Sequence, residues 1–156
     1  MSLAHSWGIQ TNERDIVYPC DDMDNNFDSK CTLYRAITIK APAEEIYLWL
    51  CQLRFSSCSY DLIGRSKKNA LQLTLHSQPE LEINQTIMDI FELISFEQNV
   101  HITLSIKPDS GYPLDRLIVS YMIIKQEGNT CRLICKANMK YRRSLVGYIA
   151  KKILPW

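Results

Sequence analysis

Glycine, histidine and long apolar runs are scarce in this sequence of 156 residues, and each scarcity excludes a class of protein. The five glycines, at positions 8, 64, 111, 128 and 147, are too scattered for a G-x-G-x-x-G turn or a phosphate-binding loop. The three histidines lie far apart without an H-x-x-x-H or C-x-x-C frame, which argues against a metal site. We therefore expect no nucleotide, no metal and no other cofactor.

Two further absences bear on location. No apolar run approaches the roughly 20 residues that a membrane span requires, and no charged-then-apolar leader resembles a signal peptide. The six cysteines contain no C-x-x-C pair and have strand-like or helical neighbours, so they are interpreted as small buried hydrophobic residues. These observations predict a cytoplasmic protein without stable membrane insertion.

The net charge of +1 argues against bulk attraction to nucleic acid, but the charges are unevenly distributed. Residues 1–30 contain six acidic and two basic residues, a local sum of −4, whereas no acidic residue follows Glu127. Seven basic residues follow it: Arg132, Lys136, Lys140, Arg142, Arg143, Lys151 and Lys152. The simplest interpretation is that an acidic N-terminal segment and a basic C-terminal segment lie near each other.

The first half of the chain alternates between extended and helical patterns. Residues 31–40 are expected to form a strand, preceded by an N-terminal arm over residues 1–30 that lacks regular structure. Pro42 suits the first position of a helix over residues 42–54, and acidic residues follow it in the first turn. Apolar residues recur at helical spacing on one face: Ile46, Trp49, Leu50 and Leu53. Ser59 then caps a short second helix that ends at Ile63.

The second half is typical of an antiparallel sheet. Residues 86–94 form a mostly apolar strand, residues 100–107 a half-buried strand with His101 on its polar face, and residues 115–125 a long strand. A turn at 127–129 leads into the final strand. There Cys131, Leu133, Cys135, Ala137 and Met139 face one way, and Arg132, Lys136, Asn138 and Lys140 face the other. Alternation also places Arg116 and Arg132 in solvent.

The last element, from about 141 to 154, has Val146, Ile149, Ala150 and Ile153 at helical spacing. Sequential strands joined by short turns form an antiparallel sheet, and this helix can cover its concave face. The sequence thus predicts an α+β fold with a single domain over residues 31–156.

The passage from strand through Ala41-Pro42 into an amphipathic helix resembles the start of the START-like, or SRPBCC, superfamily. Two other stretches resemble its bacterial polyketide cyclase/dehydrase-like branch, namely Trp7-Gly8 with Tyr18-Pro19-Cys20-Asp21-Asp22, and Ser59-Tyr60-Asp61-Leu62. The resemblance covers about the first 65 residues well and implies a helix-grip fold. In that fold a curved antiparallel sheet wraps around a C-terminal helix, and two short helices follow strand one.

A curved sheet with a covering helix leaves a cavity between them, and large apolar cavities suit hydrophobic small molecules. The residues expected to bind the ligand are Arg35, Trp49, Tyr60, Phe91, Tyr121 and Met139, with Cys135 as a further wall residue. Residue by residue, plain core packing is the preferred explanation of these positions, and the cavity gains support only from the whole set together with the fold. Arg35 shares a face with apolar residues of its strand, so it needs an acidic partner or an anionic ligand, unless a strand-edge bulge turns it outward.

Three functions are compatible with this pattern. The favoured one is non-catalytic binding of a hydrophobic or amphipathic small molecule or lipid. The second, which the resemblance implies, is an enzyme of the polyketide cyclase/aromatase type, for which Arg35, Tyr60, Asp61 and His101 are the available polar groups. The third is an interaction or membrane-surface adaptor that uses the basic C-terminal helix.

Overall fold

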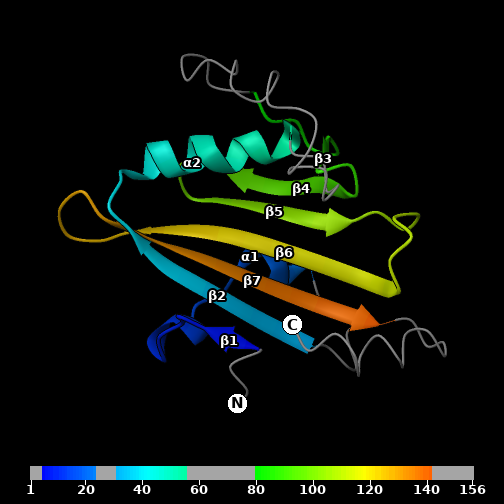
Figure 1. Cartoon of the computed structure of the whole chain (residues 1–156), viewed down its shortest axis with the longest axis horizontal. Helices are drawn as coiled ribbons and strands as arrows, with labels where there is room; N and C mark the ends of the chain where they lie inside the picture. Colours follow the sequence, from blue (N-terminus) through cyan, green and yellow to red (C-terminus); the bar gives the residue numbers. More distant parts are fainter. Residues whose placement is uncertain (1–4, 24–30, 56–79, 142–156) are drawn as a thin grey trace, which may run out of the picture.

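The computed structural model describes residues 5–23, 31–55 and 80–141, and its core is one seven-stranded sheet (Figure 1). The strands are ordered β1-β2-β7-β6-β5-β4-β3, and every pairing is antiparallel except that of β1 with β2. The elements are β1 (Ser6–Trp7), η1 (Asn12–Arg14), α1 (Pro19–Asp22), β2 (Cys31–Ile39), α2 (Ala43–Cys51), η2 (Gln52–Phe55), β3 (Thr86–Ile87), β4 (Phe91–Glu97), β5 (His101–Ile106), β6 (Leu114–Lys125) and β7 (Cys131–Tyr141).

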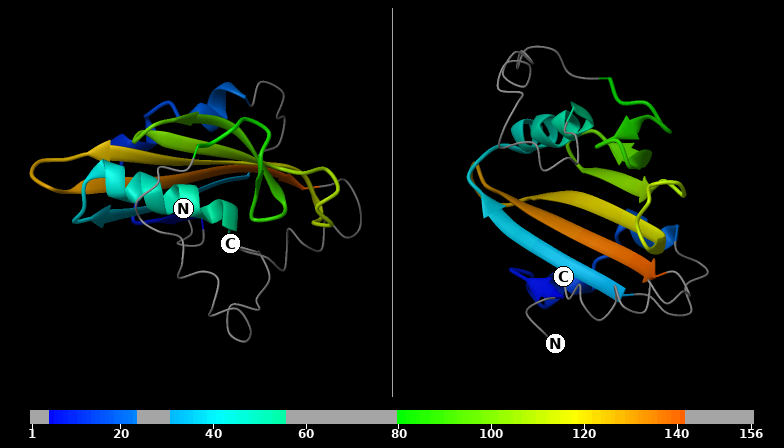
Figure 2. Two further views of the ribbon diagram at one scale, coloured as in Figure 1. Left: turned by 90° about the horizontal axis from the view of Figure 1, so that it is seen from above. Right: turned by 45° about the vertical axis from the view of Figure 1, so that its right-hand side comes forward.

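The two faces of the sheet are covered by different parts of the chain, and Figure 2 shows α1 and α2 on opposite sides of it. We call them the α2 face, which packs against α2, and the arm face, on which residues 5–23 lie. The core of the α2 face includes Leu93, Leu104, Val119, Ile123, Cys131 and Ala137. The core of the arm face consists of Tyr18, Cys20, Ala36, Ile118 and Ile134.

The predicted α+β fold with a curved antiparallel sheet is confirmed. The expected second helix near Ser59 and the expected C-terminal helix lie outside the described residues, as do the basic residues beyond position 141. Among the described residues, none of the helices combines the length and the apolar character needed to cross a membrane. The division into residues 1–30 and 31–156 stays a prediction.

One predicted strand is in fact two. The segment expected to form a single strand over 86–94 is a tight hairpin of β3 and β4, with Ile87 paired to Phe91. The chain reverses at Met88 and Asp89, whose φ angles of 50° and 62° lie in the left-handed region. Hairpin turns of this kind are usually marked by glycine or asparagine, and this one contains neither, so its only turn-favouring residue is Asp89.

The N-terminal arm is more regular than the sequence indicated, because residues 5–23 contain β1, η1 and α1. Gly8 has a φ of 71° and passes so close to Ala36 that a side chain at this position would meet its backbone carbonyl. Tyr18 and Cys20 are fully buried against the sheet, and the Cys20 backbone N–H donates to Ser120 Oγ over 3.0 Å. The arm therefore forms the second layer on this face of the sheet.

A buried and a partly buried ion pair connect the arm to β7. Arg132 Nε lies 2.6 Å from Glu13 Oε1, and Lys136 Nζ lies 2.7 Å from Asp21 Oδ2. Asn138 Nδ2 donates to the other oxygen of Asp21 over 3.2 Å. The expectation that the acidic and basic segments meet is confirmed for these pairs. The expectation that Arg132 faces solvent is wrong, because the arm covers it and leaves it 6% exposed.

These pairs predict a specific loss of stability in acid. The hydrogen bond from Arg132 lowers the pKa of Glu13; at Asp21 burial acts in the opposite direction, but bonds from Lys136, the Tyr18 N–H and Asn138 still lower the pKa. A carboxyl whose pKa is lowered by folding stabilises the native state above its unfolded pKa, and this contribution is lost as pH falls through the folded value. The free energy of unfolding should therefore fall steadily below about pH 5.

Urea unfolding of the wild type and of a Glu13→Gln/Asp21→Asn variant, at several values between about pH 3 and about pH 7, checks this. The variant is expected to be less stable at neutral pH and to lose less on acidification. Parallel loss of stability in the two proteins would show that other carboxyls control the acid transition.

Candidate functional site

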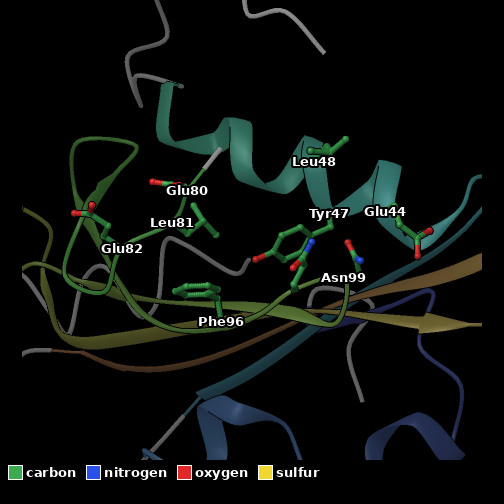
Figure 3. A pocket seen from close by; sticks show the side chains of 9 residues that line it. Glu44, Tyr47, Leu48, Glu80, Leu81, Glu82, Phe96 and Asn99 are labelled. Atoms are coloured by element: carbon green, nitrogen blue, oxygen red, sulfur yellow. The ribbon is translucent and has the colours of Figure 1, made fainter. Parts of the chain in front are cut away.

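A cleft of about 400 Å³ lies between α2, the segment 80–82 and the turn that joins β4 to β5 (Figure 3). We call it the α2 cleft. The described residues that line it are Glu44, Tyr47, Leu48, Glu80, Leu81, Glu82, Phe96, Gln98 and Asn99. Figure 3 shows Tyr47 reaching down from the helix and Phe96 lying on the strand below it. The cleft therefore has an apolar interior between a helix and a sheet, with polar groups around it.

The helical wall follows from the way α2 packs. The helix begins at Ala43, one residue later than expected, so that Pro42 is its N-cap, and Ile46 and Leu50 are buried as predicted. The side of α2 that packs against the sheet includes Tyr47, which is 7% exposed, but not Trp49, which is 59% exposed. Burial raises the pKa of Tyr47 to about 12, so its hydroxyl stays protonated at neutral pH.

The opposite wall depends on an irregularity in β4. The pairing of β4 with β5 shifts register between Leu93 and Ser95, which is the mark of a β-bulge. Beyond the shift, Phe96 pairs with Ile102 and packs against the core of the α2 face. The following turn contains Asn99 with a φ of 63°, a conformation that asparagine tolerates better than most residues. The bulge and the turn together place Phe96 and Asn99 along the cleft.

Carboxylates give the cleft its charge. Glu44, Glu80 and Glu82 all line it, and none of the nine lining residues that the structure describes is basic. Glu44 pairs with Lys125 over 3.2 Å, but both side chains are more than half exposed, so the pair is weak. A backbone hydrogen bond and the Lys125 ammonium lower the pKa of Glu44. The described wall of the cleft is therefore anionic at neutral pH.

None of the predicted ligand-binding residues that the structure describes lines this cleft. Tyr121 lies in the middle of the sheet, where it pairs with Cys135 and Ile102, and Ile102 in turn pairs with Phe96. Phe91 and Met139 are buried, at 8% and 5% exposure. Trp49 points away from the packed side of α2, and Tyr60 lies outside the described residues. Whether any of them contacts a ligand stays a prediction.

Arg35 extends the series of cross-strand pairs that contains Cys135, Tyr121, Ile102 and Phe96. It sits opposite Cys135 in a regular β2–β7 register, so the expected alternative of a strand-edge bulge that turns it outward is wrong. Its Nη1 donates to the Tyr34 carbonyl over 2.8 Å. The row Arg35, Cys135, Tyr121, Ile102, Phe96 thus runs across the sheet and ends at the cleft. Burial raises the pKa of Cys135 to about 12, which makes this thiol a poor nucleophile.

Sequence reasoning missed the residues that form the cleft, although one signal was present. Ala43, Ile46, Tyr47 and Leu50 recur at helical spacing as well as the predicted face does, and they form the buried side of α2. The bulge that presents Phe96 left no comparable signal, because the sequence of β4 contains neither glycine nor proline.

His101 is separated from the cleft by the sheet. It pairs with Met122, which packs in the core of the arm face, and its Nε2 lies 3.1 Å from Ser95 Oγ. The expectation of a half-buried strand here is wrong, since His101 is 9% and Thr103 0% exposed. Burial lowers the pKa of His101, so the ring is neutral at pH 7. Asp61, the other expected acid–base group, lies outside the described residues.

Comparison with known proteins gives a likeness of fold and no close relative. No protein-family model matches this chain, and no curated protein matches it. Similar solved structures include norcoclaurine synthase from Thalictrum flavum, with 9% identity and a TM-score of 0.49 over 81% of this chain and 78% of that one. A protein from Thermobifida fusca has 12% identity and a TM-score of 0.47 over 78% and 81% of the two chains.

A third similar structure is a START superfamily protein from Mycobacterium smegmatis, with 12% identity and a TM-score of 0.42 over 78% of this chain and 84% of that one. No residue role is transferred from these proteins to this chain.

Proposed function

We propose that this chain binds a hydrophobic or amphipathic small molecule in the α2 cleft. The observation that carries this proposal is a cavity of about 400 Å³ whose lining includes Tyr47, Leu48, Leu81 and Phe96. Small-molecule sites are typically apolar clefts of roughly 300–1,000 Å³ with a few polar groups at defined places. An apolar ligand body would gain about 25 cal/mol for each Å² that it buries there.

Binding without catalysis is the better supported form of this function. A cyclase/aromatase reaction needs an acid or base at the ligand, and His101 lies across the sheet from the cleft. Glu44 lines the cleft, but its lowered pKa makes its carboxylate a weaker base at neutral pH. The described residues therefore supply a place for a ligand more readily than a reaction.

Filling the cleft tests the proposal. Leu81→Trp places an indole against the space between Tyr47 and Phe96, whereas Ile83→Trp, two residues along, adds the same indole at a position that is 51% exposed and does not line the cleft. The uncharged fluorescent probe N-phenyl-1-naphthylamine is titrated into the wild type and both variants. We expect Leu81→Trp to weaken probe binding about tenfold and Ile83→Trp to leave it unchanged.

Urea unfolding of each variant checks that the fold is intact. Equal affinities in the two tryptophan variants would place the bound probe elsewhere, and a wild type that binds no probe would refute the proposal. Native mass spectrometry of the purified protein offers an independent readout, since a retained small molecule adds a defined mass.

A further inference from the structure

Two aromatic rings line the α2 cleft from opposite walls. Tyr47 descends from α2 and Phe96 rises from β4, so a molecule between helix and sheet would contact both side chains (Figure 3). The face of an aromatic ring carries negative charge density and attracts cations, an attraction that grows when the site is partly desolvated. These rings are therefore suited to hold an alkyl or aryl group that carries a positive charge.

The charged groups around the two rings also favour a positively charged ligand. Glu80 and Glu82 lie toward one end of the cleft, and Glu44 lies toward the other, beside Asn99 (Figure 3). No lysine, arginine or histidine is among the nine described lining residues, so an anionic ligand would meet three carboxylates along the described wall. The nearest described cations are already engaged, since Lys125 pairs with Glu44 and Arg54 Nη1 donates to the Glu80 carbonyl over 3.2 Å. Glu44 has its partner Lys125 on the surface, where a ligand cation can compete for the carboxylate.

We propose that the ligand of the α2 cleft is an organic cation, namely a primary or quaternary amine attached to an apolar body small enough for about 400 Å³. This inference rests on the proposed function and specifies the chemistry of its ligand. The apolar body lies between Tyr47 and Phe96, and the ammonium group lies toward the carboxylates. A neutral ligand with the same body fills the same space without the electrostatic gain.

Three molecules with the same apolar body and different charge separate the electrostatic contribution to binding from the apolar one. 4-Phenylbutylamine, 4-phenylbutan-1-ol and 4-phenylbutyrate are titrated into the full chain by calorimetry at neutral pH and low salt. We expect the amine to bind about tenfold more tightly than the alcohol, and the carboxylate to bind more weakly than the alcohol. Added salt should reduce the difference between amine and carboxylate and leave the affinity of the alcohol unchanged.

Neutral variants of the acidic residues identify which end of the cleft holds the charge. Glu80→Gln/Glu82→Gln and Glu44→Gln each remove carboxylates from one end, and Glu45→Gln is a matched control because Glu45 is exposed in the same first turn and does not line the cleft. We expect at least one of the first two variants to abolish the preference for the amine while its affinity for the alcohol is kept. Glu45→Gln should bind all three molecules as the wild type does.

Failure of the cation inference can be distinguished from failure of the proposed function. If the alcohol binds but the carboxylate binds as tightly as the amine, or if the preference for the amine survives loss of all three lining carboxylates, the cation inference is overturned and the binding function stands. If none of the three molecules binds and N-phenyl-1-naphthylamine does not bind either, the proposed function is refuted together with the inference.

Discussion

Replacing Arg132 with methionine is expected to lower the free energy of unfolding by about 3–5 kcal/mol, because it leaves a buried carboxylate without its partner. Glu13 is 6% exposed and receives two hydrogen bonds from this guanidinium, at 2.6 and 3.0 Å. The same guanidinium donates to Thr38 Oγ1 and to the Gly8 carbonyl, so the arm and β2 lose contacts together. Urea unfolding at neutral pH measures the change.

Two further variants distinguish the loss of the ion pair from the burial of an unpaired carboxylate. Glu13→Gln in the Arg132→Met background removes the unpaired charge, and the double variant should recover part of the lost stability. Lys125→Met is the control for an exposed pair, since the Lys125 and Glu44 side chains are 67% and 54% exposed, and it should change stability very little. An Arg132→Met protein as stable as Lys125→Met would mean that the pair is solvated in solution.

The final strand shows what alternation along a sequence can and cannot establish. The predicted division of side chains between two faces is confirmed, since Cys131 and Ala137 pack in the core of the α2 face and Arg132 and Lys136 point to the other side. Alternation does not say what covers each face, and the charged face was assigned to solvent. The charge asymmetry between the two ends of the chain held the missing information, because it predicted that the acidic arm and the basic segment meet.

The α2 cleft is not the cavity that the sequence predicted, which lies between the sheet and a C-terminal helix outside the described residues. The position of the α2 cleft depends on the bulge between Leu93 and Ser95 and on the direction of Tyr47. Both are settled by packing between segments distant in sequence. Trp49 was expected on the packed side of α2 because it fits the spacing of Ile46 and Leu50, yet Tyr47 fits the helical repeat as well and occupies that side.

Replacing Tyr18 with alanine should destabilise the whole protein, by about 3–5 kcal/mol, because the change opens a large cavity under the arm. Tyr18 is 0% exposed, its ring packs edge-on against Tyr34 at 6.2 Å, and the Lys136 ammonium lies 4.8 Å from its centroid. Its hydroxyl also donates to the Glu13 carbonyl over 2.6 Å. Tyr18→Phe removes only that hydrogen bond and should cost about 0.5–1.5 kcal/mol.

The neighbouring position supplies the control for this experiment. Val17 is 69% exposed, so Val17→Ala should stay within about 0.5 kcal/mol of the wild type. If the arm belongs to the same cooperative unit as the sheet, Tyr18→Ala lowers the midpoint of a single unfolding transition that circular dichroism and tryptophan fluorescence report alike. An unchanged main transition, preceded by a separate one at lower urea concentration, would mean that the arm detaches on its own and that the sheet is stable without this layer.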